Sequence, residues 1–317
     1  MHAQDIEPEA RLDHLDTAGY AVVRSFLTDA EAAAFEADYV AGSDQRASYE
    51  VRAVSPRARS AIDPKLTAMA RAVARASTVR VDVVSSGVFG SAYFTTESDV
   101  GSPWHQDAVS YYAYQNHHDY LNFYIPIVKP ERDRSNLCVV PFDVLEARSP
   151  EHARRLRGTG ATRFVVKRGT TIVHDNNAGG IRGVLPYALD DIAVTPQLGR
   201  GDLLLLRGDV IHRTEDTRTR RVAVSIRMMN RQSVVRRHEL VRGGLLKAFV
   251  MTRGRRDFQQ LFDAFAATGR DQLTIGELEA STGRTAARPG SQLGFLTFLL
   301  WNRLRDRLSS RPKGARS

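Results

Sequence analysis

Two histidines and one aspartate have the types and spacing of a metal-ligand set. His105 and Asp107 are separated by one residue, and in an extended segment such residues point to the same face, so both can contact one ion. His212, which follows a predicted strand at Leu203–Leu206 and a short loop, is expected to complete the set. Two histidines and one carboxylate on one face of iron(II) leave positions open for a co-substrate and dioxygen. The three residues therefore predict a non-haem oxygenase site.

The segment after His212 alternates between residues that are expected to face inward and outward. The inward residues are Arg221, Ala223, Ser225 and Arg227, and the apolar residues between them would pack against covering helices. The small Ala223 and Ser225 leave room for a ligand. Arg221 offers a bidentate clamp for the distal carboxylate of a dicarboxylic co-substrate. Arg227 is a candidate for holding the substrate or a second anion.

Other histidines and polar segments are weaker candidates. His174 follows a strand and is an alternative iron ligand, but no strand with an arginine follows it. His117 and His118 belong to a polar loop and are expected at the surface. The glycine-rich segment 176–183 is either an active-site lid or a surface crossover between sheets.

The elements that must position these residues indicate a β-rich fold. A strand is expected within Gly19–Leu27, and Thr28 with Glu31 forms the capping box of a helix. A second helix is predicted at residues 65–76. Eight short β-prone runs follow: Val81–Ser85, Ser91–Thr95, Leu121–Ile127, Leu137–Val140, Thr170–His174, Asp191–Thr195, Leu203–Leu206 and Val222–Met228. This pattern predicts a double-sheet barrel or jelly roll, covered on one outer face by helices.

Residues 231–317 are expected to form a helical extension that packs on the barrel domain of residues 1–230. Asp257–Ala267 and Gln292–Leu308 are its clearest helices, and Thr274 opens a capping box between them. The last helix places four leucines near one stripe: Leu293, Leu296, Leu300 and Leu304. That stripe is expected to dock on its own domain or on a second subunit of a homodimer. A membrane surface is the alternative.

Composition narrows the class of protein. The 317 residues are 42% hydrophobic and 26% charged, which suits one sizeable core rather than a disordered chain. The single cysteine, Cys138, excludes an internal disulfide framework. No apolar run reaches the length of a spanning helix, and the acidic start lacks the features of a signal peptide, so a cytoplasmic location is expected.

The positive charge is concentrated in the C-terminal quarter. Residues 1–230 hold 28 Lys and Arg against 29 Asp and Glu, whereas residues 231–317 hold 17 against 7. The extension therefore carries +10 and the remainder −1, which together give the net +9. Such a segment is either a solvated basic surface or an attractor of phosphates, acidic carrier proteins or anionic membranes. No recognised nucleic-acid motif accompanies it, so nucleic acid is not an expected partner.

Several stretches in this order resemble the phytanoyl-CoA dioxygenase family of iron(II)/2-oxoglutarate oxygenases. They are GYAVVRSFLTDAE, PWHQD, LNFYIPI with SNLCVVPFD, GDLLLLRGDVIHRT and RRVAVSIR, and the resemblance spans about residues 17–230. It implies a double-stranded β-helix with iron at His105, Asp107 and His212. It also implies that the 2-oxoglutarate carboxylate binds Arg221.

The resemblance also implies roles for neighbouring residues and a reaction. Thr214 and Tyr124 match positions that line the co-substrate site. Trp104, Gln106 and Asn136 are candidates for contacting the substrate or supporting the ligands. With 2-oxoglutarate and O2 as co-substrates, the expected reaction is hydroxylation of a small organic molecule, either free or linked to a carrier or to coenzyme A.

Some assignments stay open at this point. The interval between His212 and Arg221 is short for the family, so Arg220 and Arg227 are alternative anchors for 2-oxoglutarate. Relatives that halogenate carry a small residue in place of Asp107, and the carboxylate here favours hydroxylation, with desaturation or cyclisation as alternatives. A barrel of the same fold that binds a ligand without catalysis is the competing function.

Overall fold

The computed structural model describes residues 11–42, 52–84, 92–96, 103–177, 180–215, 219–282 and 291–309. A six-stranded antiparallel sheet forms its first layer, in the order β1-β9-β4-β11-β2, and β3 pairs with the same edge of β11 as β2. The strands are β1 (Tyr20–Val23), β2 (Val83–Val84), β3 (Ala92–Thr96), β4 (Tyr120–Val128), β9 (Leu203–Arg207) and β11 (Val222–Met229).

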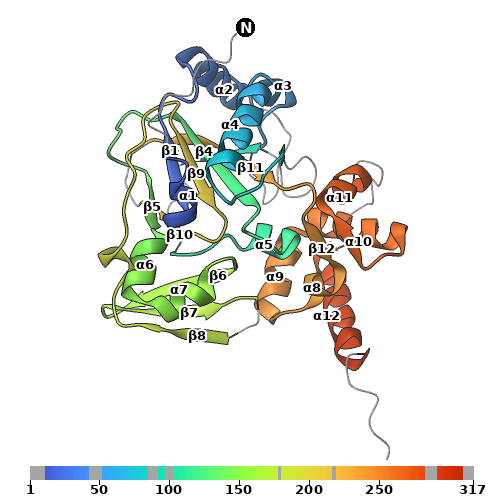
Figure 1. Cartoon of the computed structure of the whole chain (residues 1–317). Helices are drawn as coiled ribbons and strands as arrows, with labels where there is room; N and C mark the ends of the chain where they lie inside the picture. Colours follow the sequence, from blue (N-terminus) through green and yellow to red (C-terminus); the bar gives the residue numbers. More distant parts are fainter. Residues whose placement is uncertain are drawn as a thin grey trace, which may run out of the picture.

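Helices cover the outer face of this sheet (Figure 1). They are α1 (His14–Thr17), α2 (Asp29–Ala41), α3 (Pro56–Ser60) and α4 (Asp63–Ala76). Phe35 of α2 and Met69 of α4 join Val224 of β11 in one apolar cluster. The capping box at the start of α2 is confirmed, because Thr28 accepts a hydrogen bond from the Glu31 amide and the Glu31 carboxylate accepts one from the Thr28 amide.

A second layer faces the inner side of the first. It consists of β5 (Leu137–Val140), β6 (Thr162–Lys167), β7 (Thr170–Asp175), β8 (Gly180–Leu185) and β10 (Ile211–Thr214). β10 pairs with β5, while β6, β7 and β8 form a three-stranded antiparallel sheet. His105 bridges the two groups, because it pairs with His212 of β10 on one side and with Arg163 of β6 on the other. Helices α6 (Phe142–Arg148) and α7 (Pro150–Leu156) cover the outer side of this layer.

The interior between the layers explains the sequence patterns. All five residues of β9 are buried, because Leu203 and Leu205 pack toward α2 and α4 while Leu204 and Leu206 pack toward the second layer. A continuous apolar run is typical of a strand that is buried on both faces. In β11 the predicted alternation is confirmed: Val222, Val224 and Ile226 join the helix-side cluster, and Ala223 faces inward.

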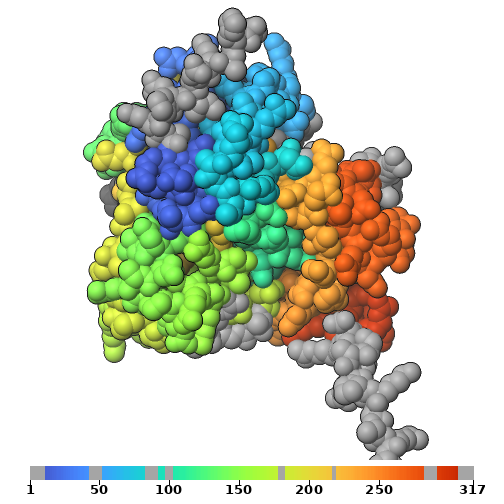
Figure 2. Space-filling view, viewed as in Figure 1, coloured from blue at the N-terminus to red at the C-terminus, as the bar shows by residue number. Residues whose placement is uncertain are grey.

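The C-terminal residues form a separate, mainly helical group beside the sheets (Figures 1 and 2, orange to red). Its elements are β12 (Val234–Arg236), α8 (Arg237–Val241), α9 (Leu245–Arg253), α10 (Arg255–Thr268), β13 (Gln272–Thr274), α11 (Ile275–Thr282) and α12 (Gln292–Ser309). An apolar cluster joins this group to α5 (Val109–Tyr114), which follows Asp107 in the chain. The predicted Thr274–Glu277 capping box is confirmed by hydrogen bonds in both directions.

Two expectations about elements were wrong. Asp191–Thr195 is not a strand: a short 3-10 helix, η3, spans Leu189–Asp191, and only Val194 makes an isolated bridge, to Val139. The stripe of the last helix also differs, because Leu293, Leu300 and Leu304 are exposed. The face that docks carries Phe295 and Leu299, and Leu296 is only partly buried.

Candidate metal centre

Backbone pairing positions the three predicted ligands. His105 and His212 exchange reciprocal hydrogen bonds, from the His105 amide to the His212 carbonyl (3.0 Å) and from the His212 amide to the His105 carbonyl (2.9 Å). On the other side, the Gln106 amide donates to the Thr162 carbonyl (2.9 Å). The segment around His105 is therefore extended between β10 and β6, although it pairs with each of them only at the single residue His105 and does not form a full strand. This pairing turns His105 and Asp107 to the same side and sets His212 opposite them.

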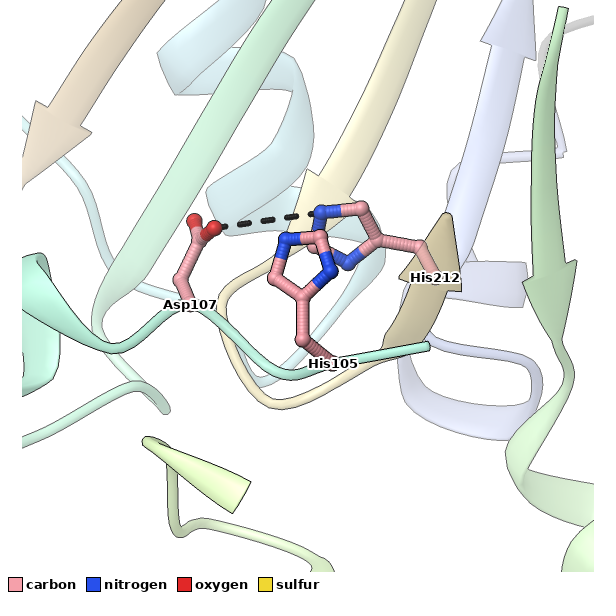
Figure 3. A group of neighbouring side chains, drawn as sticks. All are labelled: His105, Asp107 and His212. Atoms are coloured by element: carbon pink, nitrogen blue, oxygen red, sulfur yellow. Dashed lines mark ion pairs between the residues drawn. The ribbon is translucent and has the colours of Figure 1, made fainter. Parts of the chain in front are cut away.

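The three side chains converge on one point (Figure 3). Their candidate ligand atoms all lie within 4.8 Å of one another. Nε2 of His212 is 3.8 Å from Oδ1 of Asp107, and the two imidazole rings have centroids 4.4 Å apart at 48°. Among the described residues, this is the only group of three or more histidine, cysteine or acidic side chains close enough to share an ion.

Each imidazole is oriented by a backbone carbonyl two residues earlier in the chain. Nδ1 of His105 lies 2.8 Å from the Pro103 carbonyl oxygen, and Nδ1 of His212 lies 3.0 Å from that of Val210. A carbonyl only accepts hydrogen bonds, so each Nδ1 carries the proton and each Nε2 keeps its lone pair. Metal-binding histidines are held in this way in proteins, which fixes both tautomer and ring direction.

The protonation states also suit a metal. Burial, with a further contribution from His212, lowers the pKa of His105 from 6.5 to about 4. Burial raises the pKa of Asp107, but His212 and the cation of Arg227 outweigh it, and the net change is downward. At neutral pH the site therefore offers a neutral His105 imidazole and an ionised carboxylate, the forms that bind metal ions. The donor set fits iron(II) with three coordination positions left for other ligands.

Comparison with protein families agrees with this geometry. The family model described as phytanoyl-CoA dioxygenase matches residues 15–224, about two thirds of the chain. The chain belongs to the phytanoyl-CoA dioxygenase family. The matched range includes His105, Asp107, His212 and Arg221, whereas Arg227 and the C-terminal helices lie beyond it. This family uses iron(II) and 2-oxoglutarate, which fits the two-histidine, one-carboxylate set.

Similarities to solved structures are weaker. They include the non-heme α-ketoglutarate-dependent epimerase SnoN from nogalamycin biosynthesis, with 15% identity, a TM-score of 0.42, and coverage of 71% of this chain and 83% of that one. AviO1 from Streptomyces viridochromogenes Tue57 has 14% identity, a TM-score of 0.43, and coverage of 72% and 97%. HygX from Streptomyces hygroscopicus, solved with nickel and 2-oxoglutarate, has 17% identity, a TM-score of 0.40, and coverage of 69% and 86%. A comparison with curated proteins found no match.

The residues that the family pattern assigns to 2-oxoglutarate lie on the inner faces of both layers. Arg221 is buried, its guanidinium donates to the Thr96 carbonyl (2.7 Å), and its Cζ lies 5.9 Å from the centre of the Tyr124 ring. Thr214 is two residues beyond His212 on β10 and so shares its face. Arg220, in contrast, is exposed. Its exposure favours Arg221 over Arg220 as the anchor.

Arg227 lies at the opposite end of the same strand face. It is six residues beyond Arg221 in an extended chain, which corresponds to about 20 Å along the strand. Its guanidinium donates to the Tyr93 hydroxyl (3.0 Å) and lies 5.0 Å from the centre of that ring. Because its charge lowers the pKa of Asp107, Arg227 belongs to the carboxylate side of the centre. The two arginines are therefore too far apart along β11 to act as one clamp.

Trp104 and Gln106 alternate with the ligands and point to the other side of their segment. The Trp104 ring packs in the apolar cluster under α6 and α7. Its indole N–H donates to Asp190 (3.3 Å), and the Arg213 guanidinium stacks 5.0 Å from its centre. The side-chain amide of Gln106 donates through Nε2 to the backbone carbonyls of Leu156 and Asp209, at 2.9 and 2.7 Å. These contacts brace the ligand-bearing segment from behind.

Asn136 and the remaining histidines complete the set of predicted residues. Asn136 is buried and ties loops together, since it donates to the Arg132 carbonyl (3.0 Å) and accepts from the Leu198 amide (3.2 Å). His174 lies on β7, where it pairs with Arg163 of β6, and it does not join the metal-ligand group among the described residues. In the glycine-rich segment, residues 178–179 lie outside the described residues. None of the described helices is long and apolar enough to cross a membrane.

Sequence reasoning misplaced His117. The ring is fully buried, stacked on Tyr111 at 5.1 Å and set edge-on against Tyr120 at 5.2 Å. Two glycines make the space for it: a Cβ at Gly160 would meet the ring at 2.5 Å, and one at Gly208 at 1.6 Å. His118 is exposed as expected. In the sequence, the only hint that His117 is buried would be Gly160 and Gly208, and both lie far from it along the chain.

Proposed function

We propose that this protein is an iron(II)/2-oxoglutarate-dependent oxygenase that hydroxylates a small organic molecule. The observation that carries the proposal is the convergence of His105, Asp107 and His212, with both Nδ1 atoms bonded to carbonyls so that both Nε2 atoms face inward. A barrel that binds a ligand without catalysis would have no need of this complete set of ligands, with both rings turned by carbonyl contacts at Nδ1. Membership of the phytanoyl-CoA dioxygenase family supports the same function.

The fold assigned with this function is a double-stranded β-helix. Support comes from two facing layers of antiparallel strands that are linked through His105, with an interior lined by both. We assign residues 1–230 to this oxygenase domain and residues 231–317 to an extension that packs on it through α5. The ligands then lie at the inner face of the second layer, opposite the small side chain of Ala223 on β11.

The chain's residues would divide the work of binding. Iron(II) supplies the activation of dioxygen when 2-oxoglutarate is bound, and decarboxylation of that co-substrate to succinate and carbon dioxide accompanies oxidation of the substrate. Arg221 binds the distal carboxylate, because its buried guanidinium supplies a planar set of donors where water is largely excluded. Tyr124 packs beside that guanidinium, and Thr214 lines the same face.

The carboxylate of Asp107 favours hydroxylation over halogenation, and desaturation or cyclisation at the same centre is the alternative. Asp107 occupies the position that is a small residue in halogenating members of the family, so the carboxylate takes the place that a chloride would need. Arg227 adds a cation on the Asp107 side, which favours a substrate with an anionic group. The substrate is then an anionic small molecule, free or attached to a carrier.

Anaerobic addition of iron(II) and 2-oxoglutarate tests this function directly. The folded protein should develop the visible absorption band of an iron(II) ion chelated by a 2-oxo acid. His105→Ala and His212→Ala should lose the band, whereas His174→Ala should keep it and serves as the matched control. A wild-type protein that is folded but gives no band would refute the oxygenase assignment. A band without any conversion of 2-oxoglutarate to succinate in air would favour the non-catalytic alternative.

A further inference from the structure

The last helix, α12, has two apolar faces, and among the described residues only one of them is buried. Phe295 and Leu299 are buried against α10, where the Phe262 ring lies 6.3 Å from that of Phe295. The opposite face carries four large apolar side chains with between 38% and 74% of their surface exposed: Leu293, Leu300, Trp301 and Leu304. Their spacing of seven, eight and eleven residues from Leu293 keeps them on one stripe. A single exposed leucine is ordinary, but a stripe that includes tryptophan indicates a binding surface.

The neighbouring helix α9 repeats this pattern. It packs against α12, and its outer side carries Leu245, Leu246 and Phe249, with between 42% and 59% of their surface exposed. Its inner side is buried through Ala248 and Met251. Two helices in contact therefore each expose leucines and an aromatic residue.

Arginines border both exposed stripes. Arg303 and Arg305 are each one residue from Leu304, and so lie about 100° to either side of it on the helix. Arg242 precedes α9 with 71% of its side chain exposed and pairs with Glu239 at 3.0 Å, and Arg253 is the exposed last residue of α9. An apolar stripe flanked by arginines matches an amphipathic helix that lies in a lipid interface.

Charge distinguishes between possible occupants. Residues 231–317 carry +10, whereas the rest of the chain carries −1. A second copy of this chain would bring another +10 to the same interface, and the two would repel each other. An anionic lipid surface is complementary both to the positive charge and to the exposed apolar stripes. Its headgroups pair with the arginines, while leucine and tryptophan side chains enter the acyl boundary.

We propose that α9 and α12 dock the protein on an anionic membrane surface. The helices lie on the lipid rather than cross it, with Trp301, Leu300 and Leu304 inserted. Binding requires both charge and apolar contact, so it weakens as salt rises and when either set of side chains is removed. The iron site is formed by other residues, and its spectroscopic band is independent of this surface.

Tryptophan fluorescence provides the test. The chain has two tryptophans: Trp104 is buried, whereas Trp301 is 64% exposed, so a blue shift on adding vesicles reports Trp301. We expect the shift, and co-sedimentation, with vesicles containing phosphatidylglycerol and not with pure phosphatidylcholine. Arg303→Gln and Arg305→Gln should each lower the partition coefficient about fivefold. Leu304→Gln should lower it about tenfold or more.

Controls and alternative outcomes keep this test decisive. Val40→Gln changes an apolar residue on α2 that is more exposed than Leu304 (71% against 49%) and should leave vesicle binding unchanged. The surface variants should keep the iron(II)–2-oxoglutarate band, which separates this proposal from that of the oxygenase. Absence of binding to anionic vesicles at low salt overturns the proposal. So does a wild-type dimer that Leu304→Gln converts to monomer.

Discussion

The burial of His117 makes the stability of the fold sensitive to acid. Burial lowers the pKa of His117 from 6.5 to about 4, against the opposing effects of Asp107 and Asp209. A group with a lowered pKa in the folded chain takes up its proton first in the unfolded chain. Stability is therefore complete above pH 6.5 and is lost as the pH falls toward 4. The gap between the two pKa values corresponds to about 3 kcal/mol in total, of which about 2 kcal/mol is lost by pH 5.

Urea unfolding at pH 8, 6.5 and 5 measures this loss. We compare the wild-type protein with His117→Phe and His117→Gln, which cannot titrate, and with His118→Phe, which removes the exposed neighbour. Between pH 8 and pH 5 the free energy of unfolding should fall by about 2 kcal/mol less in the two His117 variants than in the wild type. His118→Phe should behave as the wild type does. His105 titrates in the same range but is present in all four proteins, so its effect cancels.

The comparison across pH separates titration from packing. Phenylalanine or glutamine in the slot between Gly160 and Gly208 will destabilise the protein at every pH, because these glycines already contact the ring closely. Such a loss is the same at pH 8 and pH 5. An equal fall in stability for the wild type and both His117 variants would refute the argument that this imidazole is kept neutral by burial.

Three further substitutions have clear expected outcomes. Arg221→Ala should raise the dissociation constant of 2-oxoglutarate by roughly 30-fold or more in calorimetry, through loss of a charge-assisted pair, whereas Arg220→Ala should not change it; the reverse result would move the anchor. Asp209→Asn should lower the free energy of unfolding by about 3–5 kcal/mol, because it removes the buried carboxylate 2.7 Å from the fully buried Arg207 guanidinium and leaves only the more distant Asp16 carboxylate at 4.0 Å; a loss under 1 kcal/mol would contradict this. Thr28→Ala should cost about 1 kcal/mol in urea unfolding by removing the cap of α2, and an unchanged midpoint would count against the cap.

Periodicity predicted the elements that are buried on defined faces. The alternation of residues along β11 correctly predicted which of them face the interior, Ala223 among them. Such alternation is reliable because the opposite register would place arginines in the apolar cluster on the helix side. The capping box at Thr28 gave the start of α2, because its hydrogen bonds are local in sequence. The prediction that His105 and His212 converge depended on several motifs taken together rather than on any single one.

Features that depend on distant partners were missed. His117 lies in a polar loop, and its burial depends on Gly160 and Gly208, which no local pattern connects to it. In α12 apolar residues occur on both sides of the helix, so the sequence could not tell the face with Phe295 from the face with Leu300. The hairpin β6–β7 was half missed, because outward residues of β6 such as Val165 are exposed and blur the alternation.

The reciprocal hydrogen bonds between His105 and His212 have a consequence for how the ion is acquired. These residues are 107 positions apart in the chain, yet they are direct neighbours in the second layer. During synthesis, a nascent chain that has emerged only as far as β8 holds two of the three ligands and cannot enclose an ion. An ion held by all three side chains, as proposed, would therefore bind only after β10 has paired with the segment of His105, and it would link the two halves of the chain.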